Sequence, residues 1–256
     1  MTEPLLLLGA QRSGTTALAH VLSEAYAAMG GIFTVNGKLP YVLARWCTRA
    51  DLACRHFRAD EISHALHRKP PGGIHAARWL GNLDRVLRDT AAEVARGEHT
   101  DPVSTCRHVI EQAYADWPCW GDKYNEYLLD LPGLLDVLPR PRVILLVRHP
   151  LEAAASQLEW TGDRPWRPSS TADACRKWAA WHASWLESAD RIAPERRLVV
   201  DYHELCSGAA TERLSAFTGL ELSGPLNALS ATRPSAIEEP SPEIAAVWRT
   251  LRHTIS

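Results

Sequence analysis

Short apolar runs alternate with longer segments of helical periodicity along much of the chain. The run Leu5–Leu8 has the length of a buried strand, and apolar residues then recur every three or four positions from Leu18 to Met29, which predicts an amphipathic helix. The continuous runs at 142–147 and 197–200 are rich in β-branched residues, as in parallel strands that are covered on both faces. The alternation predicts an α/β fold in which helices flank a central parallel sheet.

Weaker patterns complete this arrangement. Residues 30–35 predict a second short strand, and Trp120–Tyr124 predicts the end of another. Further helices are expected at 128–138, 150–160, 172–189, 209–217 and 243–251, with a loop at 161–170 and a mostly irregular segment after 223.

Residues 39 to about 117 interrupt the alternation, because they contain helical patterns and no clear strand. The predicted helices in this segment are Tyr41–Trp46, Glu61–His67, Trp79–Ala95 and Val103–Tyr114. We expect a helical insertion that packs beside the sheet and forms a wall for an acceptor substrate. The length of 256 residues suits one domain, so residues 1–256 are predicted to form a single unit that includes this insertion.

The loop Gly9–Thr16 joins the first strand to the first helix and has the features of an anion site. The free amides at a helix start and the helix dipole favour negative charge, and Gly9 and Gly14 let the backbone curl around an oxyanion. The glycine separation matches a P-loop, but Thr15 stands where that pattern has lysine, and a cation comes earlier at Arg12. An ordinary strand–turn–helix connection is the alternative interpretation.

A second candidate anion site follows the strand at 142–147. A P-loop NTPase would end such a strand in an aspartate that holds Mg²⁺, whereas this one ends in Arg148-His149-Pro150. Pro150 suits the first position of a helix, and Ser156 lies within that helix. The pattern therefore favours an anion over a metal at this position. With the Gly9–Thr16 loop, it predicts a P-loop-like three-layer fold.

Composition excludes several classes of function. The formal net charge of −2 gives no basic field for nucleic acid, and no apolar run approaches the roughly 18–20 residues of a membrane span. Six cysteines lack any C-x2-C spacing, so we interpret them as buried thiols of a reducing cytoplasm and predict no metal site. Abundant alanine and arginine with scarce lysine are typical of a bacterial source.

Taken together, the two motifs resemble the sulfotransferases that use 3′-phosphoadenosine 5′-phosphosulfate (PAPS). The loop Gly9–Thr16 looks like that family's 5′-phosphosulfate loop, and Arg148 with Ser156 looks like its 3′-phosphate motif. Asp201–Leu205 resembles an element whose tyrosine lies near the adenine. Trp120–Lys123 is similar to one whose lysine reaches the transferred sulfuryl group. Order and spacing match over about 1–36 and 118–220.

The resemblance implies a soluble, metal-independent enzyme that moves a sulfuryl group from PAPS to a hydroxyl or amine of a small molecule. Arg12 and Lys123 would stabilise the transferring group. The implied donor-binding residues are Arg12, Ser13, Gly14, Thr15, Thr16, Arg148, Ser156 and Tyr202.

The chain departs from the family at the catalytic base. Related branches carry a glutamate soon after the first helix or a histidine two residues after the lysine, whereas this chain has no carboxylate at 34–38 and has Asn125 at the second place. The candidate substitutes are Glu126, His149, Lys38, Lys123 and the insertion histidines His56, His64, His67 and His75.

Two other functions stay open. A P-loop kinase-like phosphotransferase is disfavoured because the lysine and the aspartate of that class are missing. A relative that binds PAPS or its product without turnover is kept open by the missing base.

Overall fold

A computed structural model describes residues 3–160, 167–231 and 239–255, and part of the predicted loop 161–170 lies outside them. Five parallel strands form one sheet in the order β2-β3-β1-β4-β5. The strands are β1 (Leu5–Leu8), β2 (Ile32–Val35), β3 (Trp120–Lys123), β4 (Arg142–Val147) and β5 (Arg197–Asp201). The predicted central parallel sheet is thus confirmed, with β1 in the middle.

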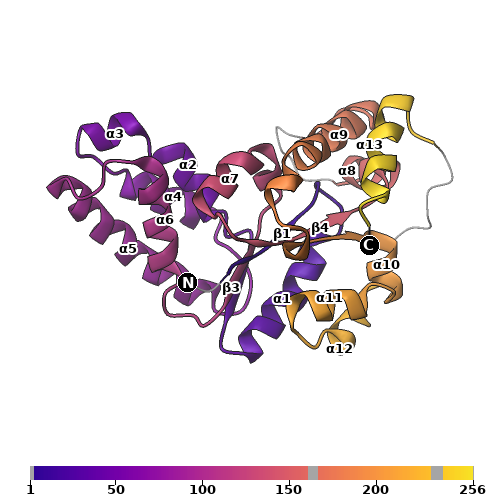
Figure 1. Cartoon of the computed structure of the whole chain (residues 1–256), viewed down its shortest axis with the longest axis horizontal. Helices are drawn as coiled ribbons and strands as arrows, with labels where there is room; N and C mark the ends of the chain where they lie inside the picture. Colours follow the sequence, from indigo (N-terminus) through magenta and orange to yellow (C-terminus); the bar gives the residue numbers. More distant parts are fainter. Residues whose placement is uncertain (1–2, 161–166, 232–238, 256) are drawn as a thin grey trace.

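Side chains that alternate along β1 point into two separate cores. Leu6 and Leu8 belong to one hydrophobic cluster, and Leu5 and Leu7 belong to another. The first cluster is covered by α7 (Leu131–Val137), α8 (Pro150–Leu158), α9 (Thr171–Ser188) and α13 (Pro242–Arg252). The second is covered by α1 (Thr15–Ala28), α10 (Tyr202–Ser207), α11 (Thr211–Thr218) and α12 (Ser223–Leu226). Figure 1 shows these helices on the two sides of the sheet, as a three-layer fold requires.

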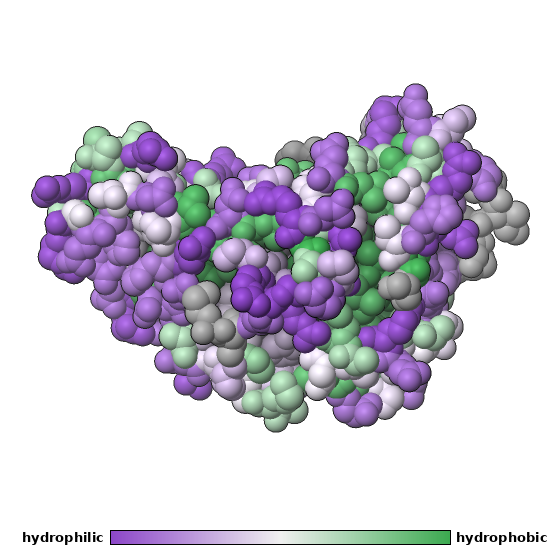
Figure 2. Space-filling view, in the orientation of Figure 1, coloured by the Kyte–Doolittle hydropathy of each residue, from purple (hydrophilic) through white to green (hydrophobic). Residues whose placement is uncertain are grey.

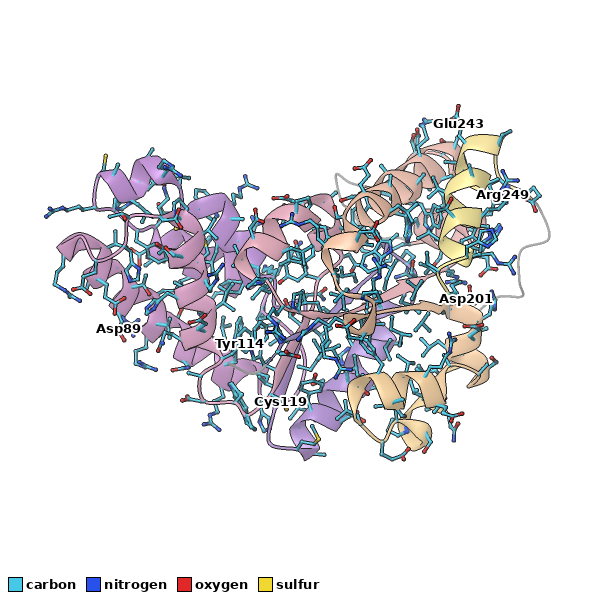
Figure 3. All side chains as sticks on the ribbon, in the orientation of Figure 1. Asp89, Tyr114, Cys119, Asp201, Glu243 and Arg249 are labelled. Carbon is cyan, nitrogen blue, oxygen red and sulfur yellow. The ribbon has the colours of Figure 1, made fainter. Side chains whose placement is uncertain are left out.

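The insertion is helical, as predicted, and lies at one end of the molecule (Figure 1). Tyr114 stacks on Trp120 of β3 with ring centroids 3.9 Å apart, and it also contacts Trp79. These rings tie the insertion to the sheet. Figure 3 labels Tyr114 where the insertion meets the sheet. In Figure 2 hydrophilic residues cover much of the visible surface of this end. The helices are α2 (Leu39–Trp46), α3 (Arg49–Ala53), α4 (Ala59–His67), α5 (Ala76–Arg96) and α6 (Pro102–Ala113).

Some local predictions were wrong. The short helix α3 was missed, because a side-chain cap at Thr48 rather than apolar periodicity defines its start. The helix expected at 128–138 is two pieces, a 3₁₀ helix η1 (Asn125–Leu129) and α7, because Asp130 caps a new helix through a bond from Gly133 N.

The cysteine prediction was wrong in part. All six thiols are free, but Cys54 is exposed, and Cys119 and Cys206 are half-buried. Only Cys47, Cys106 and Cys175 are buried as expected. No helix within the described residues has the length and apolar character that a bilayer crossing requires.

Candidate active site

The loop after β1 is shaped by the close approach of its backbone to the side chain of Tyr202. Gly14 has φ +90°, and a Cβ on it would stand 2.8 Å from the ring of Tyr202, so both conformation and space favour glycine. Helix α1 begins at Thr15 without a side-chain cap. The first amides of a helix have no partner within it, so those of Thr15 and Thr16 are available to an anion.

The parallel pairing of β1 with β4 brings the two predicted motifs together. Arg12 Nε donates to Ser156 Oγ at 3.1 Å, although 144 positions separate them. Arg148 Nη1 donates to the carbonyl oxygen of Arg12 at 3.3 Å. The two cationic motifs therefore form one continuous site at the carboxyl edge of the sheet, as parallel α/β folds lead one to expect.

Arg148 is held rigidly with part of its guanidinium unused. Its side chain is 3% exposed, its Nε donates to Glu152 Oε2 at 3.1 Å, and its Cζ lies 4.1 Å from the centroid of the Tyr202 ring. Its Nη2 is buried and has no hydrogen-bond partner among the described residues; the same holds for Ser13 Oγ. Leaving a buried guanidinium donor unpaired is costly, so the Nη2 of Arg148 indicates a ligand that is rich in acceptors.

Lys123 ends β3 on the other side of the loop. Its Nζ donates to Asn36 Oδ1 at 3.0 Å and to Thr16 Oγ1 at 3.4 Å. Burial lowers the pKa of Lys123 to about 8, because it disfavours the charged ammonium; Glu126 and Asp122 oppose the shift. A nearby anion would favour the charged form again.

The neighbouring Asp122 fixes the loop that carries Asn36. Its buried carboxylate accepts from Gly37 N at 2.8 Å and from Lys38 N at 3.0 Å. The hydroxyl of Tyr127 donates to it at 2.6 Å. Desolvation raises the pKa of Asp122, and these hydrogen bonds oppose that rise. Asp122 is thus a positioning residue for the loop beside Lys123.

One cavity of about 690 Å³ joins these parts. Lys38 and Lys69 lie on its wall together with Tyr124 and Glu126. Of the predicted donor-binding residues, its lining includes Arg12, Gly14, Thr15, Thr16, Arg148, Ser156 and Tyr202. Ser13 is buried behind the loop, and Lys123 reaches the lining through its bonds to Thr16 and Asn36.

The candidate bases are placed very differently. Glu126 lines the cavity and accepts a hydrogen bond from Gln11 Nε2 at 3.3 Å. His149 packs against Trp248 with ring centroids 5.4 Å apart and is not on the cavity wall. Burial lowers the pKa of His149. The exposed histidines of the insertion also lie outside the cavity: His56, His64, His67 and His75.

Sequence reasoning missed several residues that organise the site. Asn36 bonds Lys123, and Asn125 Nδ2 donates to Gly9 O at 2.5 Å and to Thr15 Oγ1 at 3.2 Å. Both asparagines follow parallel strands, at the edge where ligands bind, and that position was the available signal. The Arg148–Glu152 pair was also readable from its spacing of four on a helix start.

A family model described as "Sulfotransferase family" matches residues 4–224, and the chain therefore belongs to the sulfotransferase family. The matched range contains the whole sheet, the insertion and both anion motifs. Membership makes the chain a transferase of sulfuryl groups in general terms. No curated protein sequence matches it.

Solved structures support the same fold at low sequence identity. The sulfotransferase domain of the Synechococcus PCC 7002 olefin synthase has a TM-score of 0.57 at 20% identity, covering 98% of this chain and 89% of that one. The sulfotransferase domain from the curacin biosynthetic pathway has a TM-score of 0.56 at 14% identity, covering 100% of this chain and 99% of that one. A sulfotransferase from Mycobacterium avium has a TM-score of 0.52 at 14% identity, covering 100% of this chain and 77% of that one. These similarities carry the fold.

The shifted pKa of Lys123 generates a prediction about stability. Between pH 8 and about 10 the unfolded lysine keeps its proton while the folded one loses it, so this residue makes the free energy of unfolding rise with pH. Lys123→Met should therefore stabilise the ligand-free chain by about 1–3 kcal/mol at pH 7, and the gain should shrink towards pH 10. Urea unfolding at several pH values measures this.

The matched control for this measurement is Lys69→Met, since Lys69 is exposed on the same cavity. It should change the pH dependence of unfolding far less than Lys123→Met does, since burial is the larger cause of the lowered pKa of Lys38 and the Lys69 charge adds to it. A Lys123→Met chain that is less stable than the wild type by the same amount at every pH would contradict the burial penalty.

Proposed function

We propose that this sulfotransferase moves the sulfuryl group of PAPS to a hydroxyl or amine of a small-molecule acceptor. The observation that carries the proposal is one cavity that both cationic motifs line. Arg12, Thr15 and Thr16 lie on its wall, and so does Arg148, whose Nη2 has no partner among the described residues. PAPS has two separate anionic ends, a 3′-phosphate and a 5′-phosphosulfate. Two subsites at adjacent strands suit such a ligand, whereas one loop would hold only one of its ends.

The loop subsite is assigned to the 5′-phosphosulfate. The amides of Thr15 and Thr16 are available as donors, because no side chain caps the start of α1. Arg12 lines the cavity beside them. Hydrogen bonds from N–H groups and a guanidinium to a charged oxyanion are the strong ones, so this set suits a phosphosulfate.

The Arg148 subsite is assigned to the 3′-phosphate. Glu152 occupies the Nε of Arg148, which leaves Nη2 for a phosphate oxygen. Ser156 adds a hydroxyl that is already oriented by Arg12. Tyr202 lines the same part of the cavity and is assigned to the adenosine.

Bound PAPS would supply an activated sulfuryl group, and the side chains around it would do the rest. Lys123 and Arg12 place positive charge where negative charge develops during transfer. Glu126 is our proposed acceptor of the proton from the nucleophile, because it is the one carboxylate among the described residues that line the cavity. It also lies in electrostatic reach of Lys123 and Lys38.

The acceptor is assigned to the part of the cavity nearest the insertion. Lys38, Lys69, Tyr124 and Glu126 line it. The volume of about 690 Å³ must hold donor and acceptor together, which favours a small molecule.

We also propose that the chain works in a reducing cytoplasm, since its six cysteines are free thiols.

The direct test of this function is turnover. The purified chain is incubated with PAPS and a panel of hydroxyl- and amine-bearing acceptors, and mass spectrometry detects sulfated products and adenosine 3′,5′-bisphosphate. We expect sulfated products with PAPS and no phosphorylated products with ATP and Mg²⁺. Phosphorylated products with ATP and Mg²⁺, and no sulfated products with PAPS, would overturn the proposal. Tight binding of PAPS without turnover over a broad panel of acceptors would favour a non-catalytic relative.

A comparison of two nucleotides tests the role of Arg148. Arg148→Ala should weaken binding of adenosine 3′,5′-bisphosphate by about 10–100-fold, because a charge-assisted hydrogen bond to the 3′-phosphate is lost. Adenosine 5′-phosphosulfate lacks that phosphate, so the affinity of Arg148→Ala for it should fall by less than about threefold. Calorimetry measures both. Arg176→Ala, on the exposed part of α9, is the control. Equal losses for both ligands would contradict the assignment.

Glu126→Gln tests the proton acceptor. The variant keeps an oxygen for the bond from Gln11 but cannot take a proton, so kcat should fall about 100-fold or more while the affinity for adenosine 3′,5′-bisphosphate stays unchanged. Glu187→Gln, at an exposed position of α9, should leave kcat unaltered. A Glu126→Gln enzyme with wild-type kcat would exclude Glu126 as the base.

A further inference from the structure

Three potential metal ligands meet in the insertion, away from the cavity. Glu93 lies near the end of α5, His99 follows that helix, and His108 lies on α6. Gly97, with φ +84°, ends α5 and turns the chain, so that His99 folds back towards Glu93. Figure 3 labels Asp89, one helical turn before Glu93. All three side chains are partly buried, at 16–32% exposure.

Both imidazoles approach the same carboxylate oxygen. His99 Nε2 lies 2.9 Å from Glu93 Oε2, and His108 Nε2 lies 3.1 Å from it. The three ligand atoms all lie within 4.8 Å of one another. A tetrahedral ion with bonds of about 2.0–2.1 Å separates its ligand atoms by about 3.3 Å. The two nitrogen–oxygen distances of 2.9 and 3.1 Å lie within a few tenths of an ångström of that separation.

We propose that Glu93, His99 and His108 bind one divalent transition-metal ion of the zinc class. Two imidazoles and one carboxylate are a ligand set that Zn²⁺ accepts, and the remaining exposure leaves room for a water as fourth ligand. None of the residues that line the described cavity belongs to α5 or α6. The role assigned to the ion is therefore structural: it fastens the end of α5 to α6.

The experiment uses the full chain without an affinity tag, stripped of metal by a chelator. Calorimetry with Zn²⁺ should give one ion per chain with a Kd in the micromolar range or tighter, and bound Co²⁺ should give the intense visible absorption of a tetrahedral site. Zn²⁺ should also raise the Tm. Glu93→Gln and His108→Gln should each weaken binding by about tenfold or more.

His67→Gln is the matched control, because within the described residues His67 contacts a single carboxylate, Asp84, and forms no such triad. It should leave Zn²⁺ affinity unchanged. Circular dichroism of each metal-free variant separates lost binding from lost folding. Absence of stoichiometric binding to the folded wild type would overturn the proposal, as would equal losses in His67→Gln and His108→Gln.

Discussion

The parallel pairing of β1 with β4 is the constraint on which the site depends. Leu8 pairs with Leu145 in this register, so the loop after β1 and the turn after β4 leave the sheet at the same edge. Arg148 then reaches the carbonyl oxygen of Arg12, and Arg12 reaches Ser156. Two stretches more than a hundred residues apart become one cationic surface because the sheet holds their strands side by side.

The site carries costs that a ligand would offset. Arg148 and Ser13 each leave a buried donor unpaired among the described residues, and Lys123 holds its ammonium in a poorly solvated place. A protein is expected to retain such groups where they are oriented for function rather than for stability. Asp122, Glu152 and Asn125 supply that orientation by fixing the loop, the guanidinium and the backbone around them.

The sequence predicted the parts of the fold that have a strong local signal. The runs at 5–8, 142–147 and 197–200 are strands as expected, since they are continuous and, apart from Arg142 and Arg197, apolar and buried. The two motifs that carry Arg12 and Ser156 were recognised in the sequence, whereas the hydrogen bond between these two residues was not predicted and needed the structure. A short capped helix such as α3 has no apolar period to read.

The direction of side chains was the other feature that the sequence did not predict. His149 follows the strand beside Arg148 yet packs against Trp248 from α13, a contact between residues 99 positions apart that has no local signature. Asn36 and Glu126 enter the site through the relative placement of β2, β3 and the first loop. Such positions depend on tertiary packing, so a single sequence ranks them poorly.

The account depends most directly on the ligand that the two subsites prefer. Calorimetry of the wild-type chain with adenosine 3′,5′-bisphosphate and, separately, with ATP and Mg²⁺ measures this. We expect the bisphosphate to bind at least about 100-fold more tightly, a difference of about 2.8 kcal/mol. Equal or tighter binding of ATP with Mg²⁺ would contradict the central claim that the cavity is built for an adenosine with phosphate at both ends.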